Sequence, residues 1–138
     1  MATVKLTNVF DEFLASRGML AEGEVRTTQV DAFVDTGAAM LVLPLDIVDQ
    51  LGLTEVDRRT VRYANGRRDT KSIVGLVHLE IVGMPGRHGR YDAVSERPGT
   101  TPLLGQIVLE DLDLIVDPGS KEIRPDPDSP DMPTVDIS

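Results

Sequence analysis

Apolar and polar residues alternate over several stretches of the chain, a pattern that predicts β-strands. β-Branched residues prevail from residue 24 to residue 33, which favours one long strand. Residues 40–43 form a short apolar run, residues 73–82 alternate again, and residues 91–95 follow the same pattern. A further apolar run covers residues 113–117. The chain is therefore predicted to consist mostly of strands.

Helical patterns are few and short. Pro44 suits the first position of a helix and Gly52 is placed to end it. Residues 106–112 predict a second short helix, and residues 11–16 are compatible with one helical turn. Before that turn, residues 2–7 alternate weakly and favour a strand. Helices are thus expected to connect strands rather than to form the core.

Two turn signals predict hairpins. The polar stretch between the predicted strands 60–63 and 73–82 contains Asn65-Gly66, a pair that forms tight turns readily. Pro118-Gly119 predicts a second turn, after which residues 121–124 return as a partner strand. A third turn is expected over residues 83–90. Each of these turns joins neighbouring strands of a β-structure.

The end of the chain differs in composition from the rest. From Pro125 onward proline and aspartate dominate; proline removes backbone donors and the like charges repel. The spacing of a calcium-binding loop is absent from these aspartates. We therefore predict one domain over residues 1–124 and a disordered tail over residues 125–138.

Composition narrows the classes of function. The 138 residues are 41% hydrophobic, which is typical of a globular domain, and the absence of cysteine excludes disulfides and thiolate chemistry. A net charge of −9 and 4% aromatic residues argue against a nucleic-acid partner, so the basic pairs Arg58-Arg59 and Arg67-Arg68 are interpreted as solvated loop charges. Neither a membrane span nor an export signal is evident, and a cytoplasmic protein is expected.

The two histidines offer little chemistry. His78 lies within an alternating strand pattern and His88 within the predicted turn at residues 83–90. Two distant histidines without cysteine make a poor metal site, and no serine lies in a nucleophile-elbow sequence. We expect no metal and assign both histidines a structural or solvated role.

One acidic residue stands out by its setting. The apolar run Ala32-Phe33-Val34 leads into Asp35-Thr36-Gly37, where the glycine turns the chain away and presents Asp35 at a strand end. Asp and Gly also dominate ordinary turns, so the tripeptide alone is weak evidence. A second apolar pair and glycine occur downstream at Leu103-Leu104-Gly105, again before a short helix. Overlaying Gly105 on Gly37 makes the two segments similar halves of one repeated unit.

Together, these two motifs resemble those of the retropepsin-like (retroviral-type, clan AA) aspartic proteases, over roughly residues 24–118. The resemblance implies an all-β acid-protease barrel with one or two short helices and two pseudo-repeated halves. It also implies a homodimer with one Asp35 from each chain as the catalytic residue, a peptide or protein substrate, and no cofactor.

The resemblance assigns roles to further residues. Thr36 would brace the pair of aspartates across the two-fold axis, and Gly37 would let the substrate backbone lie close. Ala38 and Ala39 would line the floor of the substrate site. The hairpin after residue 60 would be the flap that closes over the substrate, with Asn65, Gly66 and Arg67 near its tip.

Two functions of different classes remain open on the sequence. The first is a homodimeric aspartic endopeptidase that hydrolyses peptide bonds with water activated between the two Asp35 carboxylates. The second is a non-catalytic, retropepsin-like dimeric module that binds a peptide without cutting it. The intact Asp35-Thr36-Gly37 motif favours the first, and the polar composition of the hairpin leaves room for the second.

Overall fold

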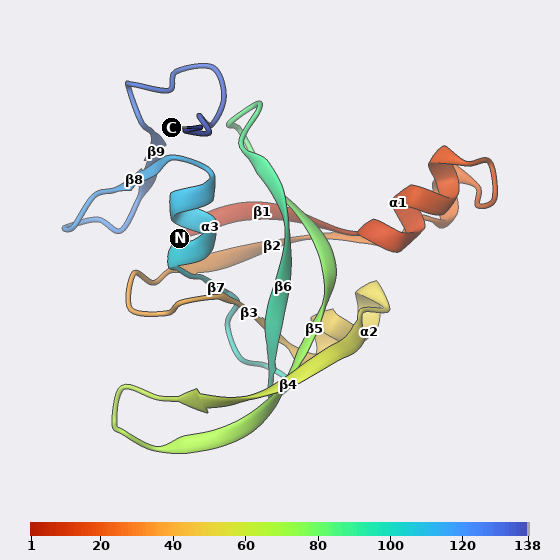
Figure 1. Ribbon diagram of the computed structural model, residues 1–138, viewed down its shortest axis with the longest axis horizontal. Helices are drawn as coiled ribbons and strands as arrows, with labels where there is room; N and C mark the ends of the chain where they lie inside the picture. The colour runs from red at the N-terminus through yellow and green to blue at the C-terminus, as the bar shows by residue number, and fades with distance from the viewer. Residues whose placement is uncertain (138) are drawn as a thin grey trace.

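A computed structural model describes residues 1–137, and its longest sheet closes on itself (Figure 1). The strands of this sheet, in sequence order, are β1 (Ala2–Asn8), β2 (Thr27–Val34), β3 (Leu41–Pro44), β4 (Thr54–Arg62), β5 (Arg68–Ile81), β6 (His88–Glu96) and β7 (Leu103–Leu104). Their spatial order is β1-β2-β7-β3-β6-β5-β4, and β1 also pairs with β5. Six strands therefore form a closed barrel, with β4 attached outside as a partner of β5. The predicted all-β barrel is confirmed.

Short helices decorate the barrel. They are α1 (Val9–Ser16), α2 (Leu45–Leu51) and α3 (Gln106–Asp111), with a 3₁₀ turn, η1, at Glu22–Glu24. The described residues thus contain three α-helices where one or two were expected. The third is α1, where one helical turn was considered compatible with residues 11–16. It begins at Val9 because the Asn8 side chain accepts a hydrogen bond from the backbone N–H of Asp11 at 3.0 Å. None of the helices in residues 1–137 has the length and apolar character needed to cross a membrane.

Helix α2 shows how the sequence signals act locally. Pro44 ends β3 and serves as the N-cap, one position before its expected place inside the helix. Gly52 then ends α2 in the left-handed conformation, with φ of 65°. The predicted helix is confirmed, and α3 matches its prediction equally closely.

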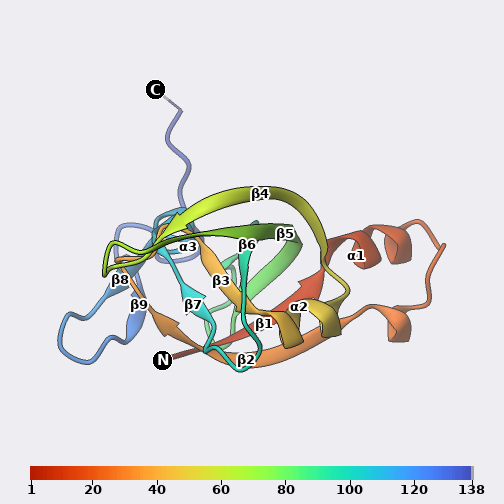
Figure 2. The same ribbon diagram turned by 90° about the horizontal axis from the view of Figure 1, so that it is seen from below.

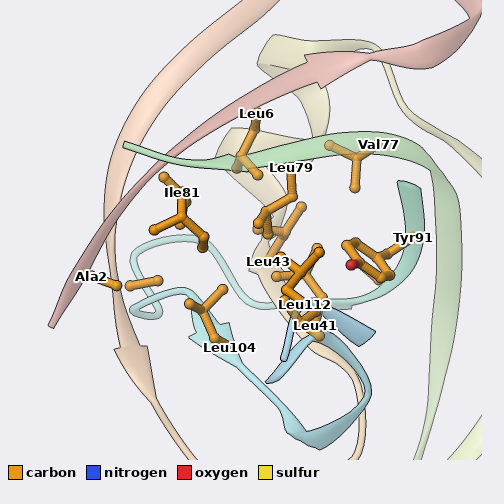
Figure 3. Packing of buried hydrophobic residues seen from close by; sticks show 14 of the residues in the cluster. Ala2, Leu6, Leu41, Leu43, Val77, Leu79, Ile81, Tyr91, Leu104 and Leu112 are labelled. Carbon is orange, nitrogen blue, oxygen red and sulfur yellow. The ribbon is translucent and has the colours of Figure 1, made fainter. Parts of the chain in front are cut away.

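The interior of the barrel is filled by aliphatic side chains from several strands and from α3, as Figure 3 shows. Leu6, Leu43, Leu79 and Leu104 have no exposed surface, and Leu41 is 1% exposed. Alternation along β5 produces this arrangement, because every second side chain of a strand points to the same face. Leu104 of this core belongs to β7, which is only two residues long. β7 pairs with the end of β2, the strand that leads into Asp35.

The hairpin of β4 and β5 is longer than predicted. Strands were expected over residues 60–63 and 73–82, whereas pairing extends from Thr54 opposite Gly75 to Arg62 opposite Arg68. The boundaries were wrong because β4 is solvent-exposed over nearly its whole length, so no alternation of apolar residues marks it. The Asn65-Gly66 turn was predicted correctly, and Gly66 adopts a φ of 82° there.

Two other boundaries also differ from prediction. Strand β6 begins at His88, so the turn expected over residues 83–90 is shorter and His88 pairs with Glu80 of β5. Strand β2 begins at Thr27 rather than residue 24, because η1 occupies the preceding residues. Polar residues on exposed strand ends explain both errors, since they are equally compatible with turns.

The last strands form a small separate sheet, in which β8 (Leu114–Val116) pairs with β9 (Ile123–Pro125) as an antiparallel hairpin. The segment after it contacts the domain. The buried guanidinium of Arg87 donates to the carbonyls of Leu112, at 3.0 Å, and of Ser129, and the Asp113 carboxylate accepts from the N–H of Thr134 at 2.7 Å. The boundary at residue 124 stays a prediction, and the part of the predicted tail up to Thr134 is held by these contacts.

Candidate active site

Strand β7 fixes the position of the Asp35 backbone. β2 and β7 run parallel, with Phe33 opposite Leu103. The N–H of Phe33 donates to the carbonyl of Pro102 at 2.9 Å, and the N–H of Asp35 donates to the carbonyl of Leu104 at 3.0 Å. Asp35 therefore stands at the end of a strand held from both ends of β7, although nearly seventy residues separate the two segments.

The Asp35 carboxylate is displayed rather than buried. Its Oδ1 atom accepts a hydrogen bond from the backbone N–H of Gly37 at 2.9 Å, and its side chain is partly exposed. Within residues 1–137 no other hydrogen bond or ion pair engages this carboxylate. One oxygen is thus oriented by the turn and the other is free to interact with water or a second group, as a general acid or base requires.

The buried turn at Gly105 contacts the loop of residues 35–40, which we call the acidic loop. The N–H groups of Gln106 and Ile107, at the start of α3, donate to the carbonyls of Ala38 and Ala39 at 2.7 and 2.9 Å. Gly105 is buried beside these carbonyls, and a Cβ at its position would lie 2.8 Å from the Ala38 oxygen. The residues predicted as the floor of the site are therefore held by their own backbone against α3.

The predicted supporting residues lie at the surface of the loop. Thr36 and Gly37 are both exposed. The N–H of Gly37 orients Asp35, as described above, whereas the proposed contact of Thr36 across a two-fold axis stays a prediction. Within the described residues of one chain, Thr36 and the second carboxylate oxygen of Asp35 thus remain available for contact with another molecule.

The hairpin turn predicted as the flap tip lies on the same side of the molecule as the acidic loop. Both project leftward in Figure 1, where the loop after β2 lies above the turn after β4, and they overlap in the view of Figure 2. The side chain of Asn65 accepts from the N–H of Arg67 at 2.9 Å, and Gly66 completes the turn. Among residues 1–137, no hydrogen bond or ion pair joins these three residues to Asp35. The hairpin turn is therefore not held to Asp35 by polar contacts within the described residues.

Sequence reasoning missed a polar cluster beside the turn of this hairpin. The hydroxyl of Tyr63 donates to Glu96 Oε2 at 2.9 Å, and Lys71 Nζ lies 2.9 Å from Glu96 Oε1. Burial, followed by the bond to Glu96, raises the pKa of the Tyr63 hydroxyl, while the bond to Glu96 raises the pKa of the Lys71 amine. No local signal marks this cluster, because its members come from the hairpin and from the end of β6.

The two histidines meet far from Asp35. His78 Nδ1 lies 3.0 Å from Glu12 Oε2 on α1, and His78 Nε2 lies 2.9 Å from His88 Nδ1. His78 is buried and links α1 to the barrel, which is consistent with a structural role. No cluster of three or more side chains suited to a metal ion occurs in the part of the chain that the structure describes.

Comparison with known proteins agrees with this geometry. The profile of the family described as "gag-polyprotein putative aspartyl protease" matches residues 21–111, well over half of the chain. The chain belongs to this family. The matched region of this aspartyl protease relative includes the acidic loop, the β4–β5 hairpin and the buried glycine turn, so the predicted retropepsin-like membership is confirmed.

A solved structure agrees in fold. The retroviral protease-like domain of Ddi1 from Leishmania major matches with a TM-score of 0.50 and 17% sequence identity, covering 92% of this chain and 89% of that domain. At this identity the similarity establishes the retropepsin-like fold. No curated protein matches the sequence.

Proposed function

We propose that this protein is a homodimeric aspartic endopeptidase that hydrolyses peptide bonds with water held between two Asp35 carboxylates, one from each chain. The observation that carries the proposal is the Asp35 carboxylate itself. It is displayed at a strand end, oriented by the N–H of Gly37, and otherwise free within residues 1–137. Family membership and fold support the same reading.

The need for two chains follows from the chemistry. Amide hydrolysis requires a base to accept a proton from water and an acid to polarise the carbonyl and protonate the leaving nitrogen. One carboxylate does not hold both protonation states at once. Two carboxylates about 3 Å apart cannot both ionise easily, so they share one proton and divide the two tasks, as the aspartic-protease dyads do.

A two-fold axis through the site gives each part of the acidic loop a function. The free oxygen of Asp35 would face its counterpart, while exposed Thr36 would contact the partner's loop. The N–H groups of Gln106 and Ile107 hold the carbonyls of Ala38 and Ala39, so this end of the loop is anchored within each chain. Such an anchor would help to set the two carboxylates at a defined separation, which acid-base catalysis requires.

Substitution of Asp35 tests the catalytic assignment. The wild-type protein should cleave members of a mixed peptide library between about pH 4 and 7, and Asp35→Asn should lower the rate by about 10³-fold or more. Asp49→Asn is the matched control, since Asp49 is an exposed acid on α2, and it should leave cleavage unchanged. Mass spectrometry of the products reads out both. Equal cleavage by wild type and Asp35→Asn would rule out the assignment.

Mixing of subunits tests the dimer. When Asp35→Asn chains are added in excess and allowed to exchange, the activity per wild-type chain should fall with the fraction of wild-type chains, because mixed dimers hold one carboxylate. Sedimentation velocity should show two chains per particle. A fully active single chain would overturn the shared site. Binding of library peptides without cleavage at any pH would instead favour the non-catalytic module.

A further inference from the structure

The β4–β5 hairpin is basic in an acidic protein. Residues 54–71 contain six basic and three acidic residues, whereas the whole chain has a net charge of −9. Most of the excess lies toward the turn of the hairpin, at Arg62, Arg67 and Arg68. Arg67 and Arg68 were interpreted above as solvated charges, but the turn that carries them lies on the same side of the molecule as the acidic loop.

Ion pairs neutralise the base of the hairpin but not its turn. Arg58 lies 3.0 Å from Glu55, and Arg59 lies 3.5 Å from Asp57. Among residues 1–137, by contrast, no ion pair involves Arg67 or Arg97, the latter at the end of β6. The guanidinium of Arg67, an exposed residue, lies over the ring of Tyr63, 5.2 Å from its centroid.

A cavity of about 310 Å³ lies between the turn of the hairpin and the end of β6. We call it the flap-base cavity. All its lining residues are polar or charged, and Arg67 and Arg97 contribute from its two sides. Lys71 and Glu96, which also line it, neutralise each other at 2.9 Å. Asp69, the second acid of the lining, lies 3.6 Å from the same Lys71 amine. The three basic and two acidic residues leave the cavity with one net positive charge, and the two arginines are its basic groups without an ion pair among residues 1–137.

The flap-base cavity and the acidic loop are linked along the chain by the segment 97–102. Arg97 begins the segment 97–102 that leads to β7, and the carbonyl of Pro102 at its end accepts from the N–H of Phe33, two residues before Asp35. In Figure 2 the hairpin passes over the strands that carry this loop. Under the proposed protease function, a peptide lying across Asp35 and beneath the hairpin would run along the side of the molecule that carries the hairpin turn.

We propose that the flap-base cavity is a subsite for an acidic side chain of the substrate, bound through its carboxylate by Arg67 and Arg97. Guanidinium groups suit this task because they donate two parallel hydrogen bonds to one carboxylate. The proposal rests on the proposed protease function and adds a substrate class to it: peptides with Asp or Glu close to the cleaved bond. Arg97 becomes a specificity-determining residue that neither the motif nor the hairpin signal indicated.

Matched peptides test the proposal. Cleaved library peptides are resynthesised in pairs that differ only by Glu or Gln at each position around the cut, and kcat/KM is measured for each pair. At one position the wild type should prefer Glu by about tenfold, the effect of losing a charge-assisted contact. Arg97→Gln and Arg67→Gln should each reduce this ratio, and the double variant should bring it near one. Raising the salt concentration should weaken the preference.

Three controls keep the result specific. Arg17→Gln removes one positive charge from the exposed C-cap of α1 and should leave the Glu-to-Gln ratio unchanged. Arg97→Lys keeps the charge and should retain part of the preference. Thermal unfolding of each variant confirms folding; if Arg67→Gln is unstable because its contact with Tyr63 is lost, Arg97→Gln alone decides.

Failure of this proposal is distinguishable from failure of the protease assignment. Cleavage with no Glu preference at any position would overturn the acidic subsite and leave the endopeptidase intact. If no peptide is cleaved, the same pairs are compared by fluorescence anisotropy, where tighter binding of Glu peptides that is lost in Arg97→Gln would support the subsite. Equal binding of both peptides, or a preference for a single-stranded oligonucleotide over acidic peptides, would overturn it.

Discussion

The two glycine turns of the barrel occupy related positions but differ in what they do. Gly37 is exposed and its N–H orients a carboxylate, whereas Gly105 is buried and the three atoms nearest to a Cβ at its position belong to the backbone. After Gly105 the chain enters α3 at once, while after Gly37 it passes through a loop and β3 before α2. The two copies of the repeat thus differ in role. The first turn presents the Asp35 carboxylate, and the second anchors the loop that carries it.

In the overlay of Gly105 on Gly37, Leu103 takes the place of Asp35 and Leu104 that of Thr36. Leu103 is partly buried and Leu104 has no exposed surface, so the second turn carries an apolar pair where the first carries Asp35 and Thr36. The second turn therefore supplies no carboxylate, and under the proposed mechanism the second acid would come from another chain.

The largest effect is expected at Gly105. A Cβ there would overlap the carbonyl oxygen of Met40 and crowd that of Ala38, both of which are backbone atoms with no freedom to rotate away. Gly105→Ala should therefore destabilise the fold by more than about 3 kcal/mol. Chemical denaturation of variant and wild type measures the difference. A variant as stable as wild type would show that the second turn is not a rigid support.

The second-largest loss of stability is expected at Leu104, the core residue that precedes Gly105. Leu104→Ala removes a fully buried side chain and should lower the free energy of unfolding by about 3 kcal/mol. Because β7 also positions the backbone of Asp35, catalytic activity should fall together with stability. Leu45→Ala on α2 is a suitable control, since Leu45 is 41% exposed and should cost well under half as much. Similar losses at the two positions would contradict the supporting role of β7.

A matched pair of carboxylates sharpens the contrast between display and support. Asp11 is buried and accepts from the Arg26 side chain at 2.8 and 3.0 Å, and this bond lowers the pKa of the Asp11 carboxyl below its ordinary 3.8. Its contribution to stability is therefore present above the unfolded pKa and is lost as the pH falls through the lower, folded value. Asp35 has no such partner within residues 1–137.

Asp11→Asn should therefore lower the free energy of unfolding at pH 7 by about 1.5 kcal/mol and flatten the decline in stability below about pH 4. Asp35→Asn should leave both nearly unchanged. Denaturation curves between pH 2.5 and 7 measure the two variants against wild type. An equal loss of stability at pH 7 in both variants would mean that Asp35 serves the fold rather than display.

The smallest effect on stability is expected at Gly37. A Cβ there would lie 3.2 Å from Asp35 Oδ1, which is the end of a side chain able to move by a few tenths of an ångström. Gly37→Ala should therefore change stability by less than about 1 kcal/mol, yet lower peptide cleavage by more than tenfold because the carboxylate is displaced. Stability and activity measured on one preparation separate the two effects. Parallel losses would make this turn structural, like that of Gly105.

Much of this division was visible in the sequence. The apolar run before Asp35, the glycine motif at residues 103–105 and the Gly52 helix end are local signals, and the structure agrees with each. The hairpin was predicted by its Asn65-Gly66 turn, but its length was not, because exposed paired strands carry no apolar alternation. Local rules thus succeed where burial imposes a pattern.

Contacts between distant segments were not predictable. Glu96 joins Tyr63 and Lys71 across more than twenty residues, and Glu12 meets His78 across more than sixty. Each partner alone is compatible with a solvated surface residue, and only the register of β5 against β6 and the packing of α1 bring them together. The residues that line the flap-base cavity could not be predicted for the same reason, because they come from the hairpin and from the end of β6.

The pairing of β2 with β7 also determines when the acid acquires its setting during synthesis. The backbone of Asp35 is anchored to Leu104, and its loop to Gln106 and Ile107, which the ribosome adds about seventy residues later. A nascent chain that has not reached these residues lacks the anchor, so the acidic loop acquires its position only after residue 107 has been added. Under the proposed protease function, the active site would therefore be absent from unfinished chains.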